Sequence, residues 1–161
     1  MLIGIDPGST GAIVVLSADA IEVLAAMIMP TLKVGKSTRV NGAALKAFLE
    51  PWTKARAYLE AVRSSPQMGV TSAFTFGHAA GTAEGILQGA GIAYTLVTPQ
   101  RWKKNADLIG DDKDAARSRA IQLWPAWRKL DAKVRGQALA DAALSARFAV
   151  PREAPKALAE V

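Results

Sequence analysis

The stretch Ile3-Gly-Ile-Asp-Pro-Gly-Ser-Thr-Gly-Ala-Ile-Val-Val-Leu16 decides the fold of this chain. Two apolar runs flank a tight turn of Pro, Gly, Ser and Thr, and this pattern predicts two antiparallel strands, at 2–6 and 11–16. A single carboxylate, Asp6, lies where the first strand ends. The turn could bind a phosphate through its backbone amides, as in ATP-binding proteins, or Asp6 could bind a metal ion, as in nucleases. The motif alone leaves both interpretations open.

The remaining pattern predicts an α/β protein. Residues 21–29 are largely apolar, so we expect a third strand and a three-strand antiparallel meander. Further strands are expected at 56–62 and 92–97, and helices at 43–49, 77–89, about 112–123 and 136–149. The polar segment 31–40 and the segment from 64 to about 76 are predicted to be loops. This order predicts a five-stranded mixed sheet flanked by helices.

The composition limits the classes of protein that this chain can belong to. Its 161 residues predict one domain, at 1–150, followed by a flexible tail at 151–161 that contains two prolines. The absence of cysteine excludes disulfides and thiolate metal sites, and no apolar run reaches the roughly 18 residues of a membrane span. Both features favour a cytoplasmic protein. The net charge of +6 favours a polyanionic partner such as nucleic acid, although many soluble domains are basic without one.

Three acidic residues lie in apolar surroundings. Asp6 ends an apolar strand, Glu60 lies within the strand expected at 56–62, and Asp141 lies within Ala138-Leu-Ala-Asp-Ala-Ala-Leu144. A buried, ionised carboxylate standing alone costs several kcal/mol or takes up a proton, and this cost is removed if three carboxylates converge on a cation. Mg²⁺ prefers such oxygen ligands, and a pair of ions can act on a phosphodiester. Taken singly, each acid has another explanation. Asp6 could simply lie in a turn, Glu60 could contact an arginine, and Asp141 could face solvent from its helix.

In this order and in these contexts, the acids resemble those of the RuvC-like Holliday junction resolvases of the RNase H-like superfamily, in the form carried by bacteriophages and prophages. The resemblance covers roughly residues 1–149. It rests on residues 3–12, Tyr58-Leu-Glu60, Val97-Thr-Pro-Gln-Arg-Trp-Lys-Lys104 and Ala140-Asp-Ala142. The opening motif also resembles that of actin-like and sugar-kinase-like ATP-binding proteins. Those proteins need two such lobes and a much longer chain, which disfavours the ATP-binding interpretation.

The resemblance implies an RNase H-like fold and a homodimeric endonuclease that resolves four-way and other branched DNA junctions with Mg²⁺ or Mn²⁺. Carried over by position, Asp6, Glu60 and Asp141 would be the catalytic metal ligands, with Asp6 between two ions. The family has a further Asp or His one helical turn before the last acid, where this chain has Gln137 and Ala138. The missing ligand supports a second interpretation, a junction-binding protein with weak or lost cleavage.

Several basic, hydroxyl-bearing and aromatic side chains are predicted to contact DNA. The segment Gln100-Arg-Trp-Lys-Lys104 interleaves cations with an aromatic ring, which suits phosphate contacts and base stacking. A buried Trp102 with solvated neighbours fits this segment equally well. Phe74 could wedge into an opened junction, with core packing as the alternative. The complete set of expected DNA contacts is Ser9, Thr10, Phe74, Arg101, Lys103, Lys104, Lys113 and Arg117.

Four glycines, Gly77, Gly81, Gly85 and Gly89, recur at four-residue spacing and would form a bare ridge on one face of a helix. Helix glycine costs about 0.5–1 kcal/mol relative to alanine, so we expect close packing in compensation. Packing inside the chain is the favoured interpretation, and contact with a second subunit or with DNA is the alternative.

Overall fold

The computed structural model describes residues 1–110 and 114–150. Its centre is a five-stranded sheet in the order β3-β2-β1-β6-β7. The strands are β1 (Leu2–Asp6), β2 (Ala12–Leu16), β3 (Val23–Ile28), β6 (Arg56–Glu60) and β7 (Tyr94–Val97). The first three strands pair antiparallel, whereas β6 is parallel to both β1 and β7. The prediction of a mixed sheet with a three-strand meander is confirmed.

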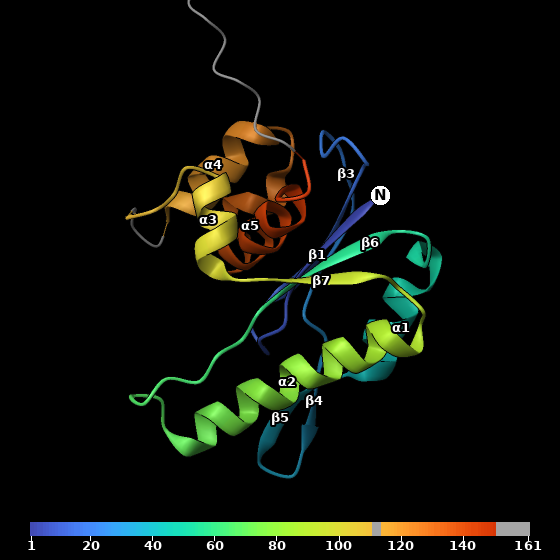
Figure 1. Ribbon diagram of the computed structural model, residues 1–161, viewed down its shortest axis with the longest axis vertical. Helices are drawn as coiled ribbons and strands as arrows, with labels where there is room; N and C mark the ends of the chain where they lie inside the picture. The colour runs from blue at the N-terminus through green and yellow to red at the C-terminus, as the bar shows by residue number, and fades with distance from the viewer. Residues whose placement is uncertain (111–113, 151–161) are drawn as a thin grey trace, which may run out of the picture.

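Helices cover both faces of this sheet (Figure 1). One face carries α1 (Gly42–Leu49), the short 3₁₀ helix η1 (Glu50–Trp52) and α2 (Val70–Gly89). The other face carries α3 (Pro99–Asn105), α4 (Ala115–Leu123), the 3₁₀ helix η2 (Arg128–Asp131) and α5 (Lys133–Arg147). Within the described residues, no helix combines the length and hydrophobicity that a membrane span requires.

Alternate residues of the central strands point to opposite faces and build two cores. Ile3 and Ile5 of β1 pack with α1 and α2, whereas Val14 and Leu16 of β2 pack with α5. Both strands are therefore covered on both faces. This double burial explains why their sequences are continuous apolar runs rather than an alternation of apolar and polar residues.

Helix α5 packs very closely against the sheet because β1 contains a glycine at the crossing point. A Cβ atom at Gly4 would overlap the backbone carbonyl of Ala142. The facing side of α5 is rich in alanine, so the two backbones approach each other without intervening bulk. This close approach places Asp141, the neighbour of Ala142, over the central strand.

Two segments that we expected to be loops have regular structure. Residues 31–40 form a hairpin of β4 (Thr31–Val34) and β5 (Ser37–Val40), which pair only with each other. Helix α2 begins at Val70, so Phe74 and Phe76 lie on a helix. Its cap residue, Gly69, has no side chain that could accept a hydrogen bond from the first turn of the helix. The sequence therefore offers no polar capping side chain as a signal there.

The glycine ridge of α2 faces outward. A Cβ atom at Gly77, Gly81, Gly85 or Gly89 would meet no atom within 4 Å. The buried side of the helix is formed instead by Ala79, Ala83 and Leu87. The favoured prediction, close packing of the glycines inside the chain, is therefore wrong.

The expected flexible tail at 151–161 lies outside the described residues, and the expected domain boundary at 150 stays a prediction.

Candidate active site

The three predicted acids lie around one end of the central strand. Asp6 and Glu60 are the last residues of β1 and β6, which are neighbouring parallel strands, so both carboxylates lie at the same edge of the sheet. Asp141 lies on α5, next to the residue that packs on Gly4 of β1. All three side chains are half-buried.

The three carboxylates affect one another's protonation. Burial raises the pKa of Asp6, and a hydrogen bond from the backbone N–H of Gly8 opposes this in part. Burial, followed by the negative charge of Asp6, raises the pKa of Glu60. Burial, followed by the charges of Asp6 and Glu60, raises the pKa of Asp141 to about 7. A cation placed among the three carboxylates would relieve the repulsion between their negative charges.

Two further side chains hold these carboxylates. Nε1 of Trp102 donates a hydrogen bond to Oε2 of Glu60 over 2.8 Å, and Nε2 of Gln137 donates to Oδ1 of Asp141 over 2.9 Å. The side chain of Trp102 is 1% exposed, so its interpretation as a core residue is correct and stacking on DNA is wrong. The spacing of four residues between Gln137 and Asp141 is a signal from which their contact could have been predicted.

The donor set has the chemistry of a site for a hard cation. Besides the three carboxylates, Oε1 of Gln137 is a buried oxygen without a hydrogen-bond partner among the described residues. Such atoms are normally satisfied by water or an ion. As they stand, no three His, Cys, Asp or Glu side chains in the described part of the chain are grouped tightly enough to hold a metal ion. The residues thus fit Mg²⁺ or Mn²⁺ in kind, and binding requires the carboxylates to move closer together.

The turn between β1 and β2 wraps around Asp6. The backbone N–H of Gly8 donates to Oδ1 of Asp6 over 3.3 Å, and the N–H of Gly11 donates to the carbonyl of Gly8 over 2.8 Å. A Cβ atom at Gly11 would overlap the backbone carbonyl of Asp6, so this position requires glycine. Two predicted DNA contacts, the half-buried Ser9 and the exposed Thr10, lie on this turn.

A cavity of about 450 Å³ lies beside Glu60. Its walls come from the segment after β6, from the start of α3 and from α2. The lining residues are Glu60, Ala61, Val62, Arg63, Phe76, Thr98, Pro99 and Gln100. Of the three acids, Glu60 therefore borders a hollow that is open to solvent.

The predicted DNA contacts on α3 are exposed, and one of them lies close to the acids. Lys103 lowers the pKa of both Glu60 and Asp141 through its positive charge, although this effect is smaller than that of burial. Arg101 lies over the ring of Phe148, with its guanidinium carbon 5.2 Å from the ring centroid. Lys104 is exposed on the same helix. Their roles in DNA binding stay predictions.

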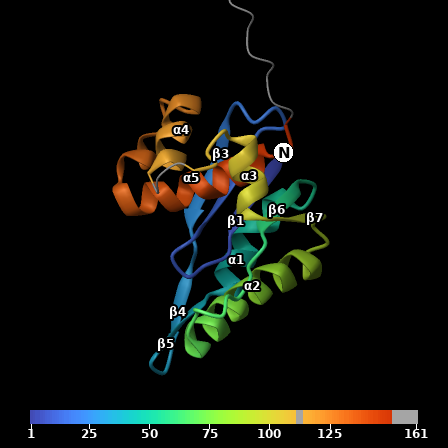
Figure 2. The same ribbon diagram turned by 60° about the vertical axis from the view of Figure 1, so that its left-hand side comes forward.

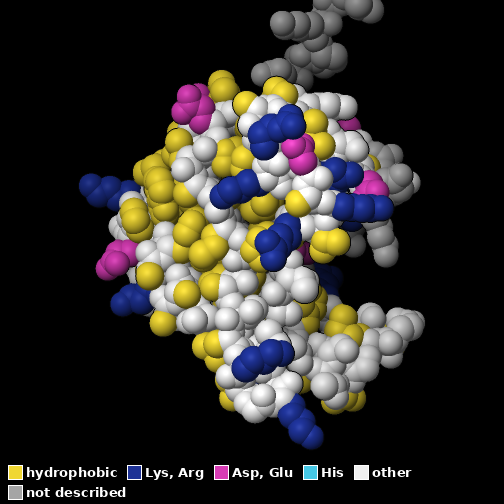
Figure 3. Space-filling view, turned by 180° about the vertical axis from the view of Figure 1, so that it is seen from behind, with side chains coloured by type: hydrophobic (Ala, Val, Ile, Leu, Met, Phe, Trp, Pro, Cys, Tyr) yellow, Lys and Arg dark blue, Asp and Glu magenta, His cyan; other side chains and the backbone are white. Residues whose placement is uncertain are grey.

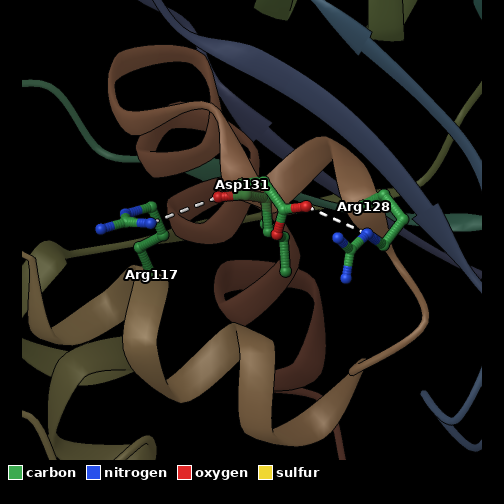
Figure 4. A network of polar contacts seen from close by, with 4 residues as sticks. Arg117, Arg128 and Asp131 are labelled. Carbon is green, nitrogen blue, oxygen red and sulfur yellow. Dashed lines mark hydrogen bonds and ion pairs between the residues drawn. The ribbon is translucent and has the colours of Figure 1, made fainter.

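Three further predicted DNA contacts lie elsewhere. Phe74 is 69% exposed on α2. Arg117 of α4 turns inward, where its Nη1 donates to the carbonyl of Leu130 over 3.5 Å, beside the ion pair between Arg128 and Asp131 (Figure 4). Its geometry favours a structural role, the attachment of α4 to η2. The last of the three, Lys113, lies outside the described residues.

Known structures with the same fold were found, at low sequence identity. RuvC of Thermus thermophilus in complex with a Holliday junction substrate aligns with a TM-score of 0.60 and 17% identity, over 91% of this chain and 90% of that chain. A second Thermus thermophilus RuvC structure aligns with a TM-score of 0.54 and 14% identity, over 91% and 92% of the two chains. No family model and no curated protein sequence matches this chain. The chain therefore has a RuvC-like α/β fold.

Proposed function

We propose that this protein is a metal-dependent endonuclease that resolves four-way DNA junctions. The observation that carries the proposal is the arrangement of Asp6, Glu60 and Asp141, three carboxylates of raised pKa at one end of the central strand. The RuvC-like fold supports it, since one structure of that fold is a complex with a Holliday junction. The net charge of +6 suits a polyanionic substrate.

The three carboxylates would hold Mg²⁺ or Mn²⁺, with two ions as the expected number. When bound, such ions supply an activated water and stabilise the oxygen that leaves the phosphorus. The chain's own residues prepare this site. Trp102 and Gln137 fix one oxygen of Glu60 and one of Asp141, which leaves the second oxygen of each carboxylate for a ligand. Lys103 adds a positive charge where a phosphate would lie.

Branched DNA would approach the acids through the surrounding turn and helices. Ser9 and Thr10 can donate hydrogen bonds to a phosphate next to Asp6, and Arg101, Lys103 and Lys104 line the adjacent helix α3. Phosphate contacts of this kind position a nucleic acid without reading its sequence. The exposed Phe74 suits a contact with an unstacked base, as found at the centre of an opened junction.

A homodimer is the expected assembly, because two nicks are needed to resolve a junction. The outer face of α2 supports self-association. Glu84 is the single charged residue of this twenty-residue helix, and its carboxylate accepts a hydrogen bond from Tyr94 over 2.6 Å. An uncharged face with open glycine positions lets two cationic chains approach without placing like charges together.

A second candidate function is binding of junctions with weak or lost cleavage. The observation that favours it is the pair Gln137 and Ala138, which stands where the resolvase family carries a further Asp or His. The assignment to the bacteriophage type of the family and the cytoplasmic location are proposals that rest on the sequence alone.

The experiment is a nicking assay on a labelled four-way junction, with Mg²⁺, Mn²⁺ or a chelator. A linear duplex and a fork of the same sequence are the substrate controls, and Asp6→Asn is the protein control. We expect metal-dependent paired nicks in the junction that disappear in Asp6→Asn. Tight junction binding without nicks in either metal would contradict the enzyme and support the second candidate.

A further inference from the structure

The β4–β5 hairpin is a separate two-stranded ribbon that extends from the body of the protein beside α2 (Figure 2). Val40 anchors its base, because this side chain is buried in the same core as α1 and α2. The rest of the ribbon is largely exposed, including every residue of β4. Val34 pairs with Ser37, so Gly35 and Lys36 form the turn, and Gly35 has a φ of +58°. No part of the proposed active site accounts for this element.

The ribbon is basic and has no acidic neighbours in sequence. It carries Lys33, Lys36 and Arg39, and no Asp or Glu occurs from residue 23 to residue 49. No ion pair joins these three cations to an acid among the described residues. Nζ of Lys33 donates to the hydroxyl of Thr38 over 2.7 Å, across the ribbon. The lower part of the molecule in Figure 3, which includes the ribbon, shows Lys and Arg side chains and no Asp or Glu.

A shallow hollow connects the ribbon to the active-site turn. It has a volume of about 100 Å³ and is lined by Ser9 from the turn after Asp6, by Arg39 from β5, and by Thr75 and His78 from α2. Its walls therefore supply hydroxyls, an imidazole and a guanidinium, all of which can donate to phosphate oxygens. The ribbon and the turn that follows Asp6 thus border the same hollow.

We propose that the β4–β5 hairpin is a second DNA-contacting surface, which binds the phosphodiester backbone of the substrate at a distance from the cleaved bond. This inference rests on the proposed function. It assigns to DNA three residues, Lys33, Lys36 and Arg39, that the site does not use. A strand of four residues is about 13 Å long, which equals about four base pairs along B-DNA. The ribbon is therefore long enough to follow one arm of a junction.

The positive charge of the β4–β5 hairpin favours DNA over a second copy of the chain as its partner. A second copy also carries a net charge of +6, so cationic ribbons would repel it. DNA offers a regular line of phosphates, and each cation that neutralises one phosphate contributes to the salt dependence of binding. An acidic protein is the other occupant of suitable charge, and the experiment distinguishes it from DNA.

The test measures fluorescence anisotropy of a labelled four-way junction in a chelator, so that binding is read without cleavage. The hairpin variant is Lys33→Gln with Lys36→Gln and Arg39→Gln. The control variant removes the same charge from α1 and the segment that leads into β6, with Lys46→Gln, Lys54→Gln and Arg56→Gln, which are all exposed. We expect the hairpin variant to lose about ten-fold or more in affinity, and its logarithmic salt slope to fall by about 2 to 3. The control is expected to lose less than about three-fold.

Equal losses in the two variants, or full affinity in the hairpin variant, would overturn the proposal. Full affinity would leave an acidic protein as the partner of the ribbon. Thermal unfolding of each variant checks the fold, and Lys36→Glu in the exposed turn provides a smaller change should the triple variant unfold. Wild-type protein that binds no DNA would overturn both this proposal and the proposed function. Wild-type protein that binds but does not nick would contradict only the proposed activity.

A cross-linking experiment locates the contact independently. The chain has no cysteine, so Lys36→Cys introduces a unique thiol for a photoactivatable cross-linker. We expect it to cross-link to a junction arm, at a position several base pairs from the nicks. The matched control, Lys54→Cys, is expected to give no such product. Cross-linking that is equal at the two positions would contradict the proposal.

Discussion

Helices α5 and α2 are both rich in small residues, yet the structure uses these residues in opposite ways. On α5, alanines at 138, 140, 142, 143 and 146 are buried, and the backbone of the helix packs directly on Gly4 of the sheet. On α2, the glycines face open space and the helix buries Ala79, Ala83 and Leu87. A four-residue spacing of small side chains therefore indicates close packing only where another backbone lies opposite.

The α5 side and the α2 side of the sheet also differ in what they contribute to the proposed site. The α5 side is dense, and hydrogen bonds there join Trp102 to Glu60 and Gln137 to Asp141. The α2 side is open, carries the exposed Phe74 and borders the basic hairpin. We infer that the packed side supports the carboxylates, and that the open side adds contacts with large partners to those expected from α3.

The largest effect is expected at Gly4. Gly4→Ala would place a methyl group on the carbonyl of Ala142, so α5 has to shift away from the sheet. Overpacking costs about 1–3 kcal/mol and occasionally more, and we expect the upper end of this range because backbone has to move. Urea unfolding measures it. A variant as stable as the wild type would show that α5 does not pack on β1 as closely as described.

The next effect concerns Asp141, whose folded-state pKa of about 7 lies above its ordinary value of 3.8. Its contribution to stability is therefore present below about pH 4 and is lost as the pH rises through 7. Asp141→Asn avoids this loss and should stabilise the metal-free protein at pH 8 by about 2 kcal/mol, after allowance for solvent screening. The gain should shrink at pH 5. Urea unfolding at the two pH values measures it.

The control for this prediction is Asp131→Asn, which removes an exposed carboxylate paired with Arg128. It should change stability by only a few tenths of a kcal/mol at either pH. A gain for Asp141→Asn that is the same at pH 5 and pH 8 would show that repulsion among the carboxylates is not its cause.

A smaller effect is expected at Trp102. Trp102→Phe removes the N–H that donates to Glu60, at a cost of about 1.5 kcal/mol for a hydrogen bond to a charged group. Because this donor lowers the pKa of Glu60, its loss should raise that pKa and move the acidic limb of the nicking profile to higher pH. Trp124→Phe removes the same volume from the same core and is the control. Identical pH profiles for the two variants would leave Trp102 with a packing role only.

The smallest effect is expected on the open side, at Gly85. Gly85→Ala adds a methyl group that meets no atom within 4 Å, so it should stabilise the monomer by about 0.5–1 kcal/mol through helix propensity. Unfolding at low protein concentration measures it. Gly85→Leu, by contrast, should weaken the proposed dimer, which sedimentation at several concentrations would show. Destabilisation of the monomer by Gly85→Ala would mean that this face is packed after all.

The central sheet could be predicted from the sequence because each of its first strands can be recognised from its own stretch of residues. β1 and β2 are uninterrupted apolar runs separated by a turn. Asn41, a residue type favoured at helix N-termini, caps α1 by accepting a hydrogen bond from the backbone N–H of Ala44 over 3.1 Å. The hairpin at 31–40 also has a local signal, because residues 31–34 alternate polar and apolar side chains and Gly35 begins a two-residue turn, but its strands are exposed and lie outside the central sheet. The first turns of α2 were missed because no capping residue precedes Val70.

The acids of the site could be selected from the sequence because a carboxylate in an apolar run is unusual, whichever fold contains it. Their supporting residues could not. The contact between Trp102 and Glu60 joins residues 42 positions apart, so it depends on the way that α3 folds back over β6. The direction in which Arg117 points likewise depends on η2, which has no signal in the sequence near Arg117.

The central place of β1 has a consequence for local opening. This strand is hydrogen-bonded on both sides, to β2 and β6, and covered on both faces. Its amides should therefore exchange with solvent only through nearly complete unfolding, whereas the hairpin and the edge strands β3 and β7 open at lower free energy. The backbone of Asp6 thus stays in place while the surfaces around it fluctuate. A protein built this way would adapt its contacts to substrates of different shape while Asp6, the proposed metal ligand, keeps its position.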